Sequence, residues 1–149
     1  MISIPIISTT PAARFSSRRR ACSRLQAAPN VSAAEDGSNT IYVTDDTVWY
    51  DGVAEVARRF ANVVLLFAGS AQTRGPFHLT MDTNDAIETA QAFPNAVIVP
   101  VHYEGWAHFK QSGDDLLKAF NTLGFGSRLQ LLEPGVATII ESGTKRPKS

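Results

Sequence analysis

The chain has almost no cysteine and no long apolar run, and each shortage excludes a class of protein. Cys22 is its single cysteine, so an internal disulfide is excluded. No apolar run approaches the roughly 18–20 residues that a membrane-spanning helix needs, so no membrane partner is expected. Neither a Gly-x-Gly-x-x-Gly motif nor a Walker-type phosphate loop is present, which argues against a nucleotide-binding domain.

Acidic residues are missing from the start of the chain, and basic ones are scarce in its middle. Residues 1–34 contain five arginines and no acid, and residues 144–149 add three basic residues. Residues 35–143 hold all 14 acidic residues but only six basic ones, a net charge of −8. That segment has no basic stripe suited to a phosphate backbone, so no nucleic-acid partner is expected.

Residues 1–39 differ in kind from the rest. They are rich in Ser, Ala, Arg and Pro and poor in acids, a composition typical of organelle transit peptides. The alternatives are a disordered tail and the start of a mispredicted gene. We therefore expect a disordered or targeting-like segment over 1–39, one domain over 40–141 and a basic tail over 142–149. The expected location is cytoplasmic, with a mitochondrial one as the alternative.

From Thr40 onward, strand and helix patterns alternate. The expected strands are 40–44, 63–67, 96–99, 129–132 and 136–140, and the expected helices are 51–60, 84–92 and 112–123. Ser112 followed by Asp115 predicts a capping box for the third helix. The last two strands flank a Glu133-Pro134-Gly135 turn and are expected to form a hairpin. The order β-α-β-α-β-α-β-β predicts a layered α/β fold with buried strands.

Three polar loops that follow expected strands could carry chemistry. Asp45 and Asp46 come directly after a strand and could ligate a metal or act as a general base, or simply form a solvated turn. His102, just past a buried strand, could be a metal ligand or an acid/base, or a histidine satisfied by a backbone carbonyl. A possible pocket is predicted around Asp45, His78, Tyr103, Glu104 and Trp106, although Tyr103 and Trp106 are most simply packing residues.

Taken together, the stretches 42–50, 77–82 and 98–106 resemble metallo-β-lactamase-fold metal-dependent hydrolases, nearest the L-ascorbate-6-phosphate lactonase-like branch. The resemblance covers about residues 40–141. It implies half of a four-layer αββα sandwich, the C-terminal half. It also implies zinc or another divalent metal, with Asp46 bridging two metal ions and His102 binding one of them.

Two departures from that family bear on function. Asp45 stands where the family has a glycine, and aspartate tolerates a positive φ better than most residues. No histidine precedes His78, so the family's upstream His-x-His-x-Asp-His motif has no counterpart. A catalytic zinc site usually has three protein ligands. Two ligands predict weak or absent metal binding, so no catalytic residue is assigned and the chain alone is expected to be inactive.

Half a sandwich leaves one face of its sheet without the partner sheet. Such a face favours association, with a second copy or with a complementary half-domain. A small-molecule substrate is expected only if the fold is completed. Two hypotheses follow: a truncated or degenerate metal-dependent hydrolase, and a non-catalytic interaction module that associates through the exposed sheet face.

Overall fold

The computed structural model describes residues 2–4, 32–36, 39–58 and 62–141. Its main sheet has four strands in the order β2-β3-β4-β5. The strands are β2 (Ser32–Asp36), β3 (Asn39–Val43), β4 (Val63–Phe67) and β5 (Val97–Val101). The last three are parallel, and β2 is antiparallel to β3. Parallel neighbours require crossover connections, which the helices provide here.

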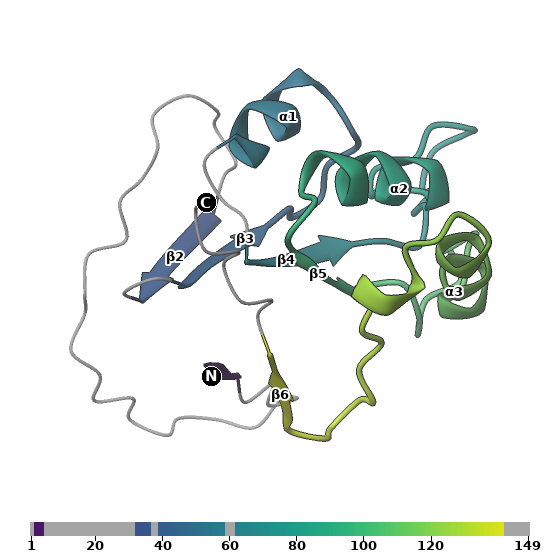
Figure 1. Ribbon diagram of the computed structural model, residues 1–149. Coiled ribbons are helices and arrows are strands. Elements are labelled where there is room, and N and C mark those ends of the chain that lie inside the picture. Colours follow the sequence, from purple (N-terminus) through teal and green to yellow (C-terminus); the bar gives the residue numbers. More distant parts are fainter. Residues whose placement is uncertain (1, 5–31, 37–38, 59–61, 142–149) are drawn as a thin grey trace, which may run out of the picture.

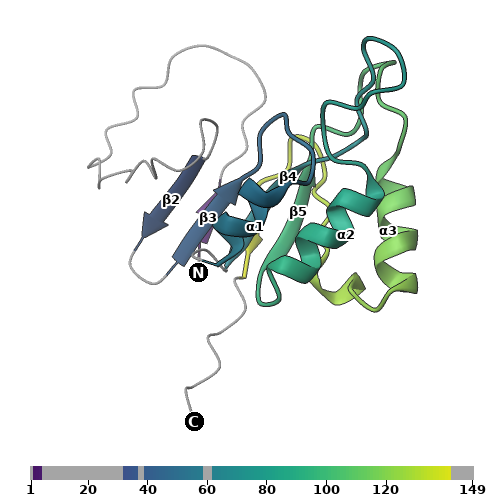
Figure 2. The ribbon, with the colours of Figure 1, turned by 90° about the horizontal axis from the view of Figure 1, so that it is seen from above.

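Three helices cover one face of this sheet (Figures 1 and 2). They are α1 (Asp51–Ala57), α2 (Thr83–Ala92) and α3 (Gly113–Thr122), and a 3₁₀ turn η1 (Gly126–Arg128) follows. The predicted helices and the predicted α/β alternation are therefore confirmed. Asp82 caps α2, and Ser112 forms the predicted capping box with Asp115. Among the described residues, none of the helices is long and apolar enough to cross a membrane.

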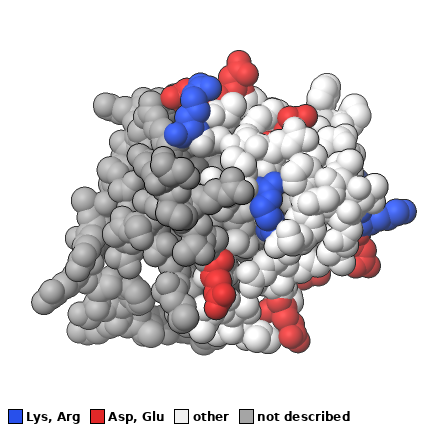
Figure 3. Space-filling view, in the orientation of Figure 1, with Lys and Arg blue, Asp and Glu red and all other residues white. Residues whose placement is uncertain are grey.

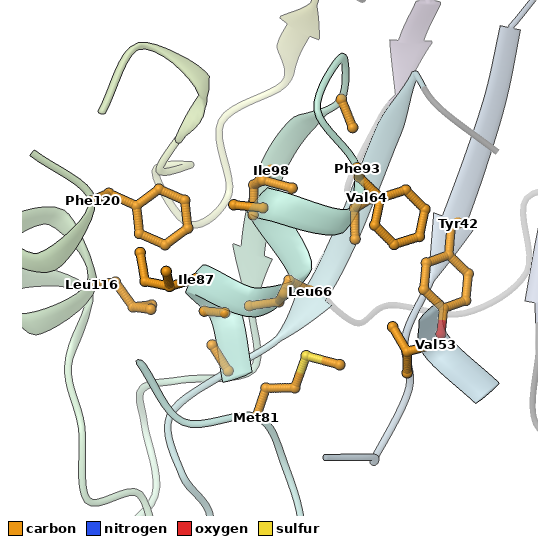
Figure 4. Close-up of a cluster of buried hydrophobic side chains, with 14 of the residues drawn as sticks. Tyr42, Val53, Val64, Leu66, Met81, Ile87, Phe93, Ile98, Leu116 and Phe120 are labelled. Carbon is orange, nitrogen blue, oxygen red and sulfur yellow. The ribbon is translucent and has the colours of Figure 1, made fainter. Parts of the chain in front are cut away.

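The main core lies between the sheet and the three helices (Figure 4). Alternate strand residues point into it, as the period of two in a strand requires: Tyr42 from β3, Val64 and Leu66 from β4, and Ile98 from β5. The helices contribute Val53, Val56, Ala86, Ile87, Ala90, Leu116 and Phe120. The Tyr42 ring stacks on Phe93 at 5.5 Å between centroids, and burial raises the pKa of the Tyr42 hydroxyl to about 12. This core fixes the strand ends, and with them the loops that follow.

The opposite face of the sheet carries a second, smaller apolar cluster. Val63 and Val99 are buried there together with Ile140, which belongs to β6 (Thr138–Ile140). The partly buried residues around them are Ile41, Leu65, Val97 and Leu132. β6 pairs antiparallel with β1 (Ile2–Ile4) and lies on the side of the sheet away from the helices (Figure 1). The chain's own C-terminal segment therefore covers part of the face that would otherwise be bare.

The predicted closing hairpin is wrong. Residues 129–132 form no strand; Leu129 makes one isolated parallel bridge to Ile98 of β5. The turn itself does form, because the Val136 amide donates to the Glu133 carbonyl at 3.1 Å. The chain then runs on to β6, whose partner is β1 rather than the preceding segment.

Two short strands, β1 and β2, lie within residues 1–39, where a disordered or targeting-like segment is predicted. The rest of that segment and the basic tail 142–149 lie outside the described residues. The predicted roles of both segments remain predictions.

Candidate functional site

The three parallel strands β3, β4 and β5 end at the same edge of the sheet, and the predicted site residues follow them. Thr44 joins two of these strand ends: its amide donates to the Leu65 carbonyl at 3.0 Å, and its hydroxyl accepts from the Phe67 amide at 2.9 Å. Thr44 is buried, so these bonds are shielded from water. The loop that begins at Asp45 is therefore held firmly at its base.

Asp46 and His102 meet at this edge. The Nδ1 atom of His102 lies 3.4 Å from Oδ1 of Asp46. The His102 side chain is 37% exposed and the Asp46 side chain is 61% exposed, so both side chains are open to solvent. The Asp46 amide donates to the Asp45 carboxylate at 3.0 Å, which fixes the turn. The structure thus brings together the two residues that the sequence singles out as metal ligands.

The His102 imidazole is oriented by aromatic neighbours. Phe67 and Phe109 contact it edge-on, with centroids at 5.2 and 5.0 Å. The His102 backbone has a φ of 56°, a left-handed conformation that is uncommon for residues other than glycine. Such strain persists only where the surrounding structure enforces it, and it gathers at functional sites. Neither phenylalanine is recognisable from the sequence as part of the site. Phe67 belongs to β4 and is distant from His102 along the chain, and Phe109 lies in the loop that follows His102.

The backbone at Gly69 lies close to the backbone of Tyr103, the residue that follows His102. A Cβ atom on Gly69 would lie 2.7 Å from the Cα atom of Tyr103, and Gly69 has a φ of 90°. Glycine is therefore required at position 69. Tyr103 is partly buried against the main core, and burial, followed by the neighbouring Glu104 carboxylate, raises the pKa of its hydroxyl.

A small pocket of about 160 Å³ lies beside His102. Residues 100–104 line one side and residues 132–136 line the other. Of the residues predicted to form a pocket, Tyr103 and Glu104 are therefore in this one, whereas Asp45, His78 and Trp106 are not among its lining residues. Trp106 is 67% exposed and stacks on His108 at 5.9 Å between centroids. The sequence does not show that the Glu133-Pro134-Gly135 turn lines this pocket, because its pattern indicates only a turn.

His78 lies apart from this pocket, at the start of α2. Its Nε2 atom is 3.3 Å from Oδ2 of Asp85, and Asp82 completes a group of three donors within 4.8 Å of one another. Asp82 caps α2 and Asp85 lies in its first turn, but no sequence pattern shows that His78 faces them.

On the visible face of the described region, basic side chains stand apart from one another (Figure 3).

Comparisons with known proteins agree with this fold. No protein-family model matches the chain. The chain is 31% identical over 96 residues to the UPF0173 protein YddR of Bacillus subtilis (strain 168), a match that covers 64% of the chain and 38% of that relative.

Solved structures extend the comparison. A possible metal-dependent hydrolase from Veillonella parvula DSM 2008 matches with a TM-score of 0.68 and 27% identity, over 74% of this chain and 43% of that one. The isothiocyanate hydrolase from Delia radicum gut bacteria matches with a TM-score of 0.64 and 25% identity, over 70% and 40%. The metallo-β-lactamase-fold protein YhfI from Bacillus subtilis, at 17% identity and a TM-score of 0.52, supports the fold alone.

The chain spans less than half the length of each of these relatives. This partial coverage fits the C-terminal half that the sequence predicts. The resemblance carried by stretches 42–50, 77–82 and 98–106 is confirmed at the level of the fold. The chain has part of the metallo-β-lactamase fold and is similar over that part to proteins described as hydrolases.

Proposed function

We propose that this chain supplies Asp46 and His102 to the divalent-metal centre of a metal-dependent hydrolase and that it is inactive without the remaining ligands. The observation that carries the proposal is the 3.4 Å approach of His102 Nδ1 to Asp46 Oδ1 at the strand ends. Zinc binds histidine nitrogen and carboxylate oxygen at about 2.0–2.2 Å in tetrahedral sites, which places neighbouring donors about 3.3–3.5 Å apart. The distance between the two donor atoms therefore suits a shared zinc ion.

The surroundings of the pair favour a ligand role. Phe67 and Phe109 hold the His102 ring, so little rotamer freedom remains to be lost on binding. Asp45 fixes the backbone at Asp46 and adds a second carboxylate nearby. A divalent metal bound there would act as a Lewis acid and activate water for hydrolysis.

The substrate would be a small molecule held beside the pair. The pocket next to His102 is small and has an apolar wall that includes Leu132 and Val136. Its acidic members are Glu104 and Glu133. The lactonase-like branch, the reaction and the substrate remain part of this proposal, because the chain matches less than half of each relative.

Zinc titration of the full chain, followed by NMR of the histidine side chains, tests the ligand assignment. The chain has three histidines, so each imidazole can be observed separately. We expect the His102 signals to shift, and to need about tenfold more zinc in the Asp46→Asn variant. Asp45→Asn is the comparison variant: it removes the neighbouring charge but neither ligand, so it should raise the zinc required by less than Asp46→Asn does. A His102 response that is absent, or unchanged in Asp46→Asn, would sink the assignment.

Inactivity of the isolated chain is tested separately. We expect hydrolysis of simple esters and lactones in the presence of zinc to proceed no faster with the wild type than with Asp46→Asn. A faster, Asp46-dependent rate would show that the chain is an enzyme by itself.

The alternative function is a non-catalytic interaction module. The observation in its favour is the second face of the sheet, where Ile41, Leu65 and Val97 are only partly buried. Size-exclusion chromatography with light scattering separates the alternatives: a stable dimer supports the module, and a monomer that unfolds cooperatively argues against it.

A further inference from the structure

A second group of metal-ligating side chains lies outside the Asp46–His102 pair. His78, Asp82 and Asp85, hereafter the α2 cluster, each offer one donor atom, and these atoms lie within 4.8 Å of one another. All three residues are partly buried, and the His78 and Asp85 side chains are 32% and 18% exposed. The group is therefore neither a solvated acidic surface nor a closed core site.

The backbone around the α2 cluster is firmly anchored. The Thr80 hydroxyl donates to the Ala68 carbonyl at 2.8 Å and accepts from the Ala71 amide at 3.0 Å. The amide of the buried Met81 donates to the Phe67 carbonyl at 3.0 Å. His78 precedes this anchor and Asp82 follows it, so the backbone next to both residues is held in place.

One donor atom lacks a hydrogen bond where it should have one. The Asp85 Oδ2 atom exposes less than 1 Å² of surface and accepts no hydrogen bond, and it is the single such buried side-chain atom among the described residues. Leaving a buried carboxylate oxygen without a donor costs about 1–3 kcal/mol or more. Its neighbour is His78 Nε2 at 3.3 Å. That separation equals the spacing of two donors on one tetrahedral zinc ion, about 3.3–3.5 Å.

We propose that the α2 cluster is a divalent-cation site of its own, separate from the Asp46–His102 pair. One imidazole nitrogen with two carboxylates suits zinc and similar transition metals better than magnesium or calcium, which prefer oxygen ligands alone. Three protein donors leave a fourth position for water. The two carboxylates neutralise the cation and outweigh the partial positive charge of about +0.5 at the start of α2.

The Asp82 capping bond is compatible with this role. Oδ1 of Asp82 accepts the Asp85 amide at 2.9 Å, which leaves its second oxygen for the cation. A His78–Asp85 ion pair without any metal is the competing explanation. It predicts no response of His78 to zinc beyond that of an ordinary exposed histidine.

The test is a zinc titration of the full chain carrying Asp46→Asn and His102→Ala, followed by NMR of the His78 and His108 imidazoles. We expect His78 to shift at lower zinc than His108, which serves as the internal control. The Asp82→Asn and Asp85→Asn variants should each raise the zinc needed for that shift by about tenfold. Asparagine caps helices as well as aspartate does, so Asp82→Asn preserves the fold.

Glu88→Gln is the matched control, because Glu88 is an exposed acid one turn further along α2. It should leave the His78 response unchanged. A His78 response that coincides with that of His108, or that survives both asparagine substitutions, would overturn the proposal. The Asp46–His102 assignment is read from a different imidazole, so either proposal can fail without the other.

Discussion

In the described part of the chain, three residues other than glycine adopt left-handed backbone conformations, and each follows one of the parallel strands. Asp45, Ser70 and His102 have φ values of 59°, 50° and 56°, at the ends of β3, β4 and β5. For an L-residue this conformation costs roughly 1–2 kcal/mol, and less for aspartate. The replacement of a family glycine by Asp45 is thus accommodated as its residue type predicts. The strain at His102 had no signal in the sequence.

Substitutions at Asp45 should separate backbone strain from side-chain chemistry. We expect Asp45→Val to lower the free energy of unfolding by about 1–2 kcal/mol, because a β-branched residue tolerates a positive φ poorly. Asp45→Gly should stay within about 1 kcal/mol of the wild type, since relief of strain offsets the lost bond to the Asp46 amide. Urea denaturation measures both. Equal stability of the valine and glycine variants would contradict the assigned conformation.

At the scale of elements, the sequence predicts what local patterns determine. The helices are recognisable because Val53 and Val56 fall at helical spacing and Ser112 with Asp115 matches a capping box. The prediction of a hairpin strand over 129–132 is wrong because strand pairing is not a local property. An apolar run beside a turn specifies an extended chain but not its partner, and the partner of Leu129 lies in β5. Strand pairing over long range is decided by packing, which a local pattern does not contain.

The capping box of α3 should contribute stability that depends on pH. The Ser112 hydroxyl and amide both donate to Asp115, and the backbone bond, then the side-chain bond, lowers the pKa of its carboxyl. A lowered pKa in the folded state means that this contribution is complete above about pH 4 and is lost as the pH falls through the lowered value. Ser112→Ala should therefore lower the free energy of unfolding at neutral pH and lower it less in acid.

Asp114→Asn is the control for that helix, because Asp114 is also in the first turn but takes no part in the capping box. Chemical denaturation at pH 7 and pH 3 gives the comparison. A Ser112→Ala penalty that is the same at both pH values would show that Asp115 does not act through the box.

At the scale of the whole molecule, only part of the site was open to prediction. The resemblance places Asp46 and His102 on a shared centre, and the fold brings them to 3.4 Å. The pocket wall from residues 132–136 and the contact of His78 with Asp85 both join segments that no motif connects. Such juxtapositions follow from how β5, α2 and the C-terminal segment pack, so they become visible only in three dimensions.

The second face of the sheet supplies the prediction that belongs to the whole molecule. Ile140 is 1% exposed and closes over Val63 and Val99, so it holds the C-terminal segment against that face. Ile140→Ala should lower the free energy of unfolding by about 2–5 kcal/mol. It should also promote self-association, because release of the segment enlarges the exposed apolar surface.

The neighbouring Ile139 is 53% exposed, so Ile139→Ala should cost less than about 1 kcal/mol and leave the oligomeric state unchanged. Denaturation and light scattering measure the two effects, and similar behaviour of both variants would mean that the segment does not shield the sheet.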